Sequence, residues 1–172
     1  SRVVTNPTFD AIAPAGAMHE YFRGNPEGKN PLEFLTKREP IRPEYRDRDE
    51  RLRVMDSQGI SRIWLFPTLG MLYEELLKHD PEAVCLTFRA FNRWLAEDWG
   101  FAYRDRIFAG PYISLADVEW AVDELQWAVD AGARVVVMRP AAVHTNQGIR
   151  NPFDDHFDRF WAAAAAQKRS KW

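Results

Sequence analysis

An arginine stands at the carboxyl end of an apolar segment, where a binding group would be well placed. In ARVVVMRPAAVH, residues 133–144, the four apolar residues 135–138 are typical of a strand buried on both faces, and Arg139 and Pro140 follow directly. A guanidinium can bind a carboxylate through two parallel hydrogen bonds. Arg139 is therefore a candidate for holding a substrate carboxylate. Pairing with a carboxylate of the protein itself, or capping of backbone carbonyls, is the alternative.

Three more polar side chains follow expected strands in the same way. Thr68 comes after WLFP, and Tyr112 and Ser114 come after IFAGP. Because the carboxyl ends of parallel strands lie at one edge of a sheet, we expect these residues and Arg139 to converge on one face as a substrate-binding set. Ser114 has a second explanation, since Ser114 and Asp117 have the spacing of a capping box. The residues leave the catalytic groups unassigned.

Helical and extended patterns alternate from about residue 45 and would position these side chains. The expected order is a helix over 45–58 ended by Gly59, a strand over 60–66, a helix capped by Asp80 with Pro81 at its first position, a strand over 106–113, a helix that Gly132 ends, a strand over 134–138, and a helix opened by Asp154 and Asp155. A hairpin signal such as Asn-Gly is missing between the strands, so all three should run parallel. Residues 1–44 are rich in Pro, Gly and Asn and should form loops and short helical turns.

This order indicates an α/β fold, and two architectures compete. One is an open doubly wound sheet and the other a (β/α)₈ barrel. Three strands are too few for either, because a complete barrel takes about 250 residues. The chain is therefore expected to be one domain holding part of such a fold, with residues 1–44 as an irregular excursion packed on residues 45–172.

Three long segments resemble the amidohydrolase-related family, the group that includes aminocarboxymuconate semialdehyde decarboxylase. They read NPTFDAIAPAGAMHEYFRGNPEGK, GISRIWLFPTLG and AFNRWLAEDWGFAYRDRIFAGPYISLADVEWAVDELQWAVDAGARVVVMRP, and the similarity runs over residues 5–165. The resemblance implies a (β/α)₈ barrel that here lacks its first strand and its C-terminal half. It also implies a metal-dependent hydrolase or decarboxylase with a small, carboxylated or aromatic substrate, and a divalent metal, usually zinc, at the carboxyl ends of the strands.

The metal ligands of that family have no matching position here. They are a His-x-His pair on the first strand, a histidine on a middle strand and an aspartate on the last. A catalytic zinc needs about three protein ligands, often at short spacings, and His19, His79, His144 and His156 form no such pair. The acidic stretch 154–158 is better explained as a helix start. We therefore expect no metal on this segment, and a catalytically inert fragment or an interaction module is the alternative function.

Composition excludes several other classes of protein. The net charge is −2 and the pI is near 6.1, which gives no general attraction to nucleic acid or to an anionic membrane. No apolar run approaches the roughly 20 residues of a membrane span, so a cytoplasmic location is expected. The single Cys85 lies in a helical pattern and should be a core thiol. Unpaired sheet edges could also join copies of the chain.

Overall fold

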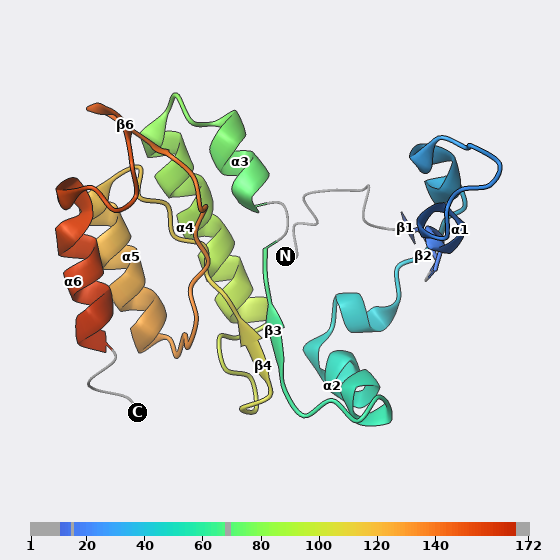
Figure 1. Cartoon of the computed structure of the whole chain (residues 1–172). Coiled ribbons are helices and arrows are strands. Elements are labelled where there is room, and N and C mark those ends of the chain that lie inside the picture. Colours follow the sequence, from blue (N-terminus) through green and yellow to red (C-terminus); the bar gives the residue numbers. More distant parts are fainter. Residues whose placement is uncertain (1–10, 15, 68–69, 168–172) are drawn as a thin grey trace. The chain divides into compact units, whose positions relative to one another are not determined.

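The structure is a computed structural model that describes residues 11–14, 16–67 and 70–167 (Figure 1). The chain divides into two compact units, Ser1–Arg46 and Asp47–Trp172. Each unit is described by itself. Of the residues singled out from the sequence, Thr68 lies outside the described residues.

Unit 1 contains short elements joined by turns. They are β1 (Ala11–Ile12), α1 (His19–Phe22), a 3₁₀ turn (Pro31–Leu35), β2 (Glu39–Pro40) and a second 3₁₀ turn (Pro43–Tyr45). β1 and β2 pair antiparallel, with Ala11 opposite Pro40. Asn30 caps the first 3₁₀ turn, since its side chain accepts from the Leu32 N–H at 2.9 Å and its own N–H donates to Glu33 at 3.1 Å. These are the loops and short helical turns that the composition predicts.

Unit 2 has a mixed α/β architecture. Its elements are α2 (Arg48–Ser57), β3 (Ile63–Leu65), α3 (Gly70–Leu76), α4 (Pro81–Asp98), β4 (Ile107–Ala109), α5 (Val118–Asp130), β5 (Val143–Thr145), β6 (Gly148–Arg150), a 3₁₀ turn (Asp155–Phe157) and α6 (Asp158–Gln167). β3 and β4 pair parallel, with Ile63 opposite Ile107 and Leu65 opposite Ala109. In Figure 1 both strands point toward the end of unit 2 where α3 and the β5–β6 hairpin lie.

The third predicted strand is present only as one parallel bridge. Val137 pairs with Tyr112, because the Val137 N–H donates to the Pro111 carbonyl and the Ile113 N–H donates to the Val137 carbonyl, both at 2.9 Å. Residues 135–138 are half-buried, so the prediction of a strand buried on both faces is wrong for this unit. Val136, Val137 and Met138 all contact the core, but each stays partly exposed.

The three predicted strands pair parallel as expected, and a hairpin that the sequence patterns do not predict follows them. β5 and β6 form an antiparallel hairpin, with Val143 opposite Arg150. Its turn has no Asn-Gly. Instead the Thr145 hydroxyl donates to the Gly148 carbonyl at 2.8 Å and accepts from the Gln147 N–H at 3.1 Å, while Gly148 takes a φ of 107°. A threonine side chain and a glycine with positive φ therefore build this turn.

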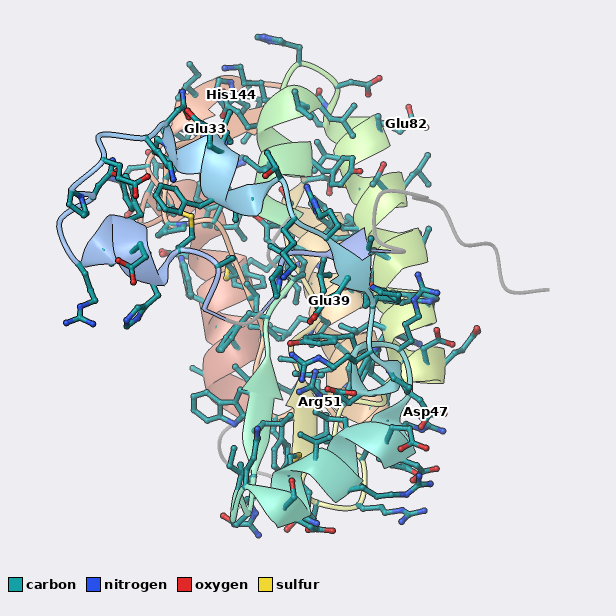
Figure 2. The ribbon with its side chains drawn as sticks, turned by 90° about the vertical axis from the view of Figure 1, so that its right-hand side faces the viewer. Glu33, Glu39, Asp47, Arg51, Glu82 and His144 are labelled. Carbon is teal, nitrogen blue, oxygen red and sulfur yellow. The ribbon has the colours of Figure 1, made fainter. Side chains whose placement is uncertain are left out.

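The helix starts follow local side-chain chemistry. The Asp80 carboxylate accepts from the Ala83 N–H at 3.0 Å, and Asp117 accepts from the Trp120 N–H at 2.9 Å. Asp47, labelled in Figure 2 at the start of α2, caps that helix in the same way. The predicted cap Asp80 is confirmed, whereas Asp117, predicted as the acidic partner of Ser114 in a capping box, is itself the cap of α5. Ser114 lies outside the α5 cap, so its capping-box explanation is wrong.

The core of unit 2 forms where helices pack on one another and on the parallel segments. α4, α5 and α6 lie side by side in Figure 1, and contacts join α4 to α5 and α5 to α6. The buried stripe of α4 includes Val84, Phe88 and Leu95, and that of α5 includes Ala121 and Leu125. Among the described residues, each helix is too short or too polar to cross a membrane.

Candidate functional site

A buried carboxylate joins the two side chains that follow β4. The Tyr112 hydroxyl donates to Glu74 Oε2 and the Ser114 hydroxyl donates to Glu74 Oε1, each at 2.5 Å. Tyr112 and Ser114 are two residues apart in an extended segment, so their side chains leave the same face. Glu74 comes from α3 and is 8% exposed. The structure therefore gathers two of the four predicted binding residues around a carboxylate that sequence reasoning missed.

The neighbouring glutamate of α3 holds the predicted anion-binding arginine. Arg139 Nη2 lies 2.5 Å from Glu75 Oε2, and Lys78 Nζ lies 2.5 Å from Glu75 Oε1. Hydrogen bonds from Lys78 and then from Arg139 lower the pKa of the Glu75 carboxyl. This is a protein carboxylate of the kind that the alternative interpretation of Arg139 expected. The adjacent carboxylates of α3 thus contact two parallel segments. Glu74 binds the residues that follow β4, and Glu75 binds Arg139, which follows residues 135–138.

The surroundings of Tyr112 keep its phenol protonated. Burial, the hydrogen bond to Glu74 and the Glu74 charge raise the pKa of Tyr112, and the positive charge of Arg139 opposes them. The ring stacks on Phe88, with centroids 4.2 Å apart and planes at 23°. A Cβ on Gly70 would lie 3.0 Å from the Tyr112 ring, so the start of α3 packs closely against it. Tyr112 is therefore a rigid hydrogen-bond donor and is not a base at neutral pH.

A buried asparagine fixes the backbone of Tyr112. The Asn92 amide donates to the Tyr112 carbonyl at 2.9 Å, and the Tyr112 N–H donates to Asn92 Oδ1 at 2.8 Å. The same amide also donates to Glu124 Oε1 at 3.0 Å. Asn92 is fully buried, so these contacts satisfy polar atoms that water does not reach.

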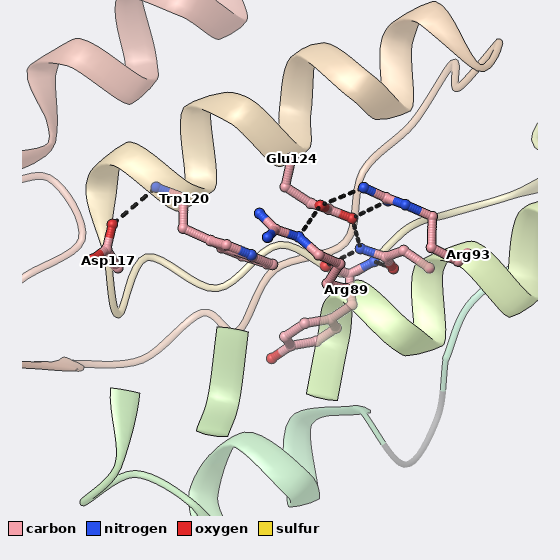
Figure 3. Close-up of polar contacts among 7 residues, drawn as sticks. Arg89, Arg93, Asp117, Trp120 and Glu124 are labelled. Carbon is pink, nitrogen blue, oxygen red and sulfur yellow. Dashed lines mark hydrogen bonds and ion pairs between the residues drawn. The ribbon is translucent and has the colours of Figure 1, made fainter. Parts of the chain in front are cut away.

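Glu124, which accepts directly from this asparagine, is itself held by two arginines (Figure 3). The Glu124 carboxylate is 1% exposed and accepts from both terminal nitrogens of Arg93, at 2.8 and 3.3 Å. Arg89 Nε lies 3.5 Å from the same carboxylate. The Arg93 guanidinium also lies 3.2 Å from the centroid of the Trp127 ring. This charged network between α4 and α5 therefore holds Asn92, and through Asn92 it positions the backbone of Tyr112.

Weak signals for these missed residues are present in the sequence. Asn92 lies four residues after Phe88, and Glu124 lies three after Ala121, so both are polar residues on the apolar stripes of their helices. A polar residue on a buried stripe needs a partner. For Glu74 and Glu75 the sequence signal is weaker, because two adjacent glutamates, as in LYEELL, are also typical of a solvent-exposed helix face.

The described residues do not fit a catalytic metal. No group of three or more His, Cys, Asp or Glu among them could hold an ion. Against the expectation from their spacing, His79 and His144 do meet, with ring centroids 6.1 Å apart. Figure 2 shows His144 at the same end of unit 2 as Glu82, which is in the first turn of α4. Two imidazoles are fewer ligands than a catalytic zinc needs.

Two other residues have the structural roles expected of them. Cys85 is buried in the core as a free thiol. Asp154 accepts from the His156 N–H at 3.0 Å and so caps the 3₁₀ turn before α6, as expected for the acidic stretch 154–158.

The chain is similar in sequence and in structure to an amidohydrolase. No family model and no curated protein matches the chain. A crystal structure described as an amidohydrolase from Mycobacterium avium subsp. paratuberculosis K-10 matches with 42% sequence identity and a TM-score of 0.84. The match covers 97% of this chain and 44% of that one, so this chain spans less than half the length of the solved protein. The similarity supports a relationship to the amidohydrolases, a family of hydrolases that are generally metal-dependent.

Proposed function

We infer that this chain belongs to an amidohydrolase-related enzyme and supplies part of its substrate-binding wall. This inference rests on the 42% sequence identity to the solved amidohydrolase over 97% of the chain, together with a TM-score of 0.84. The match covers nearly the whole chain, so the matched region includes both helices and segments that follow the strands. The proposed substrate is a small carboxylated or aromatic molecule.

The proposed architecture is part of a (β/α)₈ barrel. Three parallel segments support it, since β4 pairs with β3 and its continuation at Tyr112 pairs with Val137. Helices α3 and α4 separate β3 from β4, and α5 separates β4 from the segment of Val137, as in the repeating units of a barrel. In such a barrel the active site lies at the carboxyl ends of the strands, where Tyr112, Ser114 and Arg139 stand.

Each of these side chains has a defined part in binding. Arg139 would hold the substrate carboxylate through its guanidinium, which is still partly open to solvent at 23% exposure. Tyr112 and Ser114 would fix the backbone and side chains of the neighbouring part of the binding site, because both hydroxyls donate to Glu74. Thr68 remains a proposed contact on the strength of its place after β3.

The proposed chemistry is metal-dependent hydrolysis or decarboxylation, with zinc as the proposed metal. A divalent ion of this kind activates water or polarises a carbonyl or carboxylate group. The ligands would come from residues outside those described. The chain's own described residues bind and orient the substrate, and analysis of reaction products for released CO₂ distinguishes decarboxylation from hydrolysis.

A matched pair of ligands tests the anion site. Benzoate and benzamide have the same ring, and only benzoate offers a carboxylate. Calorimetry on the whole chain should show that Arg139→Met weakens benzoate binding by roughly tenfold or more and leaves benzamide binding unchanged. Arg62→Met is the control, because Arg62 pairs with Asp105 on the surface. Equal benzoate affinity in Arg139→Met and the parent chain would remove the proposed anion site and favour an interaction module.

A further inference from the structure

We propose that Glu75 is an internal competitor for the anion site at Arg139, and that Lys78 retains the Glu75 carboxylate when a ligand carboxylate replaces it. This inference rests on the proposed function, because it takes Arg139 as the group that binds the carboxylate of the substrate. It adds a residue that governs which ligands reach that arginine.

The contacts of Glu75 are those of an exchangeable group. Its two oxygens are divided between two cations, with Arg139 at 2.5 Å from Oε2 and Lys78 at 2.5 Å from Oε1. The Glu75 side chain is 42% exposed, so a carboxylate from solvent can approach it. Glu74 differs in both respects, since it is buried and both its oxygens accept hydroxyl hydrogen bonds.

The charges around Glu75 leave room for a second anion. Two cations, Arg139 and Lys78, share the one carboxylate of Glu75. A ligand carboxylate on Arg139 would bring this set to two cations and two anions, next to the buried Glu74 carboxylate that accepts from the Tyr112 and Ser114 hydroxyls. Lys78 lies three residues after Glu75, in the turn that follows α3, and contacts the Glu75 oxygen that Arg139 does not contact, so this pair persists after Arg139 changes partner. Partly exposed ion pairs contribute little, which makes the exchange readily reversible.

The competitor would act as a specificity filter. A neutral ligand, such as an amide or an alcohol, offers no charge to replace Glu75 on the guanidinium. A carboxylate can replace it and can also form two parallel hydrogen bonds with Arg139. The substrate class that this site admits is therefore the carboxylates, at the cost of a lower affinity than an unoccupied arginine would give.

Benzoate titration of the whole chain by calorimetry tests the exchange. Glu75→Gln keeps the size of the side chain and removes its charge, and should lower the benzoate dissociation constant by roughly two- to fivefold. Glu75→Ala should change it in the same direction. Lys78→Met should raise the constant, because Glu75 then has Arg139 as its remaining cation. Thermal melting monitored by circular dichroism checks that each variant is folded.

Two controls separate the exchange from a general effect of charge. Glu82→Gln removes the same charge from an exposed position on α4 and should leave the constant nearly unchanged. In an Arg139→Met background, Glu75→Gln should bring no gain. A gain that persists there, or that Glu82→Gln reproduces, would overturn the proposal. If Arg139→Met weakens binding while Glu75→Gln has no effect, the competitor fails alone. If Arg139→Met has no effect, the proposed anion site fails with it.

Discussion

The Asn92 side chain and the Tyr112 backbone exchange two hydrogen bonds, at 2.9 and 2.8 Å, in the way that neighbouring strands pair. α4 thereby holds the end of β4 through a side chain. The tyrosine hydroxyl on the same residue reaches Glu74 on α3. Because Tyr112 is held both by Asn92 of α4 and by Glu74 of α3, the position of the candidate site depends on how these helices pack.

Replacing Asn92 should be among the most damaging changes on α4. Asn92→Leu would leave the Tyr112 N–H and carbonyl without partners in a buried place, and should lower the free energy of unfolding by about 3 kcal/mol. Urea denaturation measures the loss. Asn146→Leu, in the exposed turn of the hairpin, is the matched control and should cost at most about 0.5 kcal/mol. Similar losses in the two variants would contradict the role given to Asn92.

The Glu74 carboxylate should couple the two hydroxyls energetically. Tyr112→Phe and Ser114→Ala each remove a donor to a buried carboxylate, so each should cost about 1.5–3 kcal/mol of unfolding free energy. In a Glu74→Gln background either loss should shrink by at least about 0.5 kcal/mol. Tyr73→Phe, on the exposed part of α3, serves as the control. Strictly additive losses in this double-mutant cycle would argue against the shared carboxylate.

A close approach between parallel segments predicts a clash at Gly110. A Cβ there would lie 2.7 Å from Val137 Cγ2, and valine side chains have little rotameric freedom. Gly110→Ala should therefore cost about 1–3 kcal/mol of unfolding free energy. Adding Val137→Ala should recover part of that loss. Val135→Ala should not, since Val135 lies at an ordinary 3.7 Å from the same point. Equal recovery by both second changes would show that the clash is elsewhere.

Stability should fall at alkaline pH. Burial, and then the Asp117 charge, raise the pKa of the Cys85 thiol from an ordinary 9.0 to about 12. A thiol with a raised pKa in the folded state contributes stability that is complete below pH 9 and is lost as pH rises toward 12. Tyr112 acts in the same direction. Urea midpoints measured at increasing pH should decline less steeply for Cys85→Ala. Parallel pH profiles for Cys85→Ala and the parent chain would exclude the thiol as a cause.

Exposed apolar side chains near β3 predict self-association of the isolated chain. Trp64 is 63% exposed and Phe66 is 55% exposed, and unpaired strand edges favour pairing between copies. Sedimentation velocity over a series of protein concentrations should show association that the double variant Trp64→Ser, Phe66→Ser reduces. Phe22→Ser, on a residue of unit 1 that is 79% exposed, is the control. A parent chain that stays monomeric at every concentration would refute this prediction.

Local chemistry explains why several elements could be predicted from the sequence. Asp80 and Asp117 cap helices by accepting from an N–H three residues later, so the interaction is contained in four residues. Gly59 and Gly132 follow helices with φ values of 68° and 98°, which glycine adopts without strain. The alternation of helix and strand patterns likewise predicts the parallel pairing of β3 with β4.

The hairpin and the burial of residues 135–138 could not be predicted in that way. The β5–β6 turn depends on a hydroxyl of Thr145 that reaches across the turn, which an expected Asn-Gly signal does not cover. The burial of residues 135–138 depends on what covers each face, and an apolar run is compatible with one covered face or two.

By itself the sequence determined the helix ends, the parallel β3–β4 pair and the placement of Tyr112, Ser114 and Arg139 after extended segments. Only the tertiary structure decided their partners. Glu74 is 38 residues from Tyr112 in the chain, and Arg139 is farther still from Glu75. Contacts at such separations arise from packing between elements, which a local pattern of residue types does not encode.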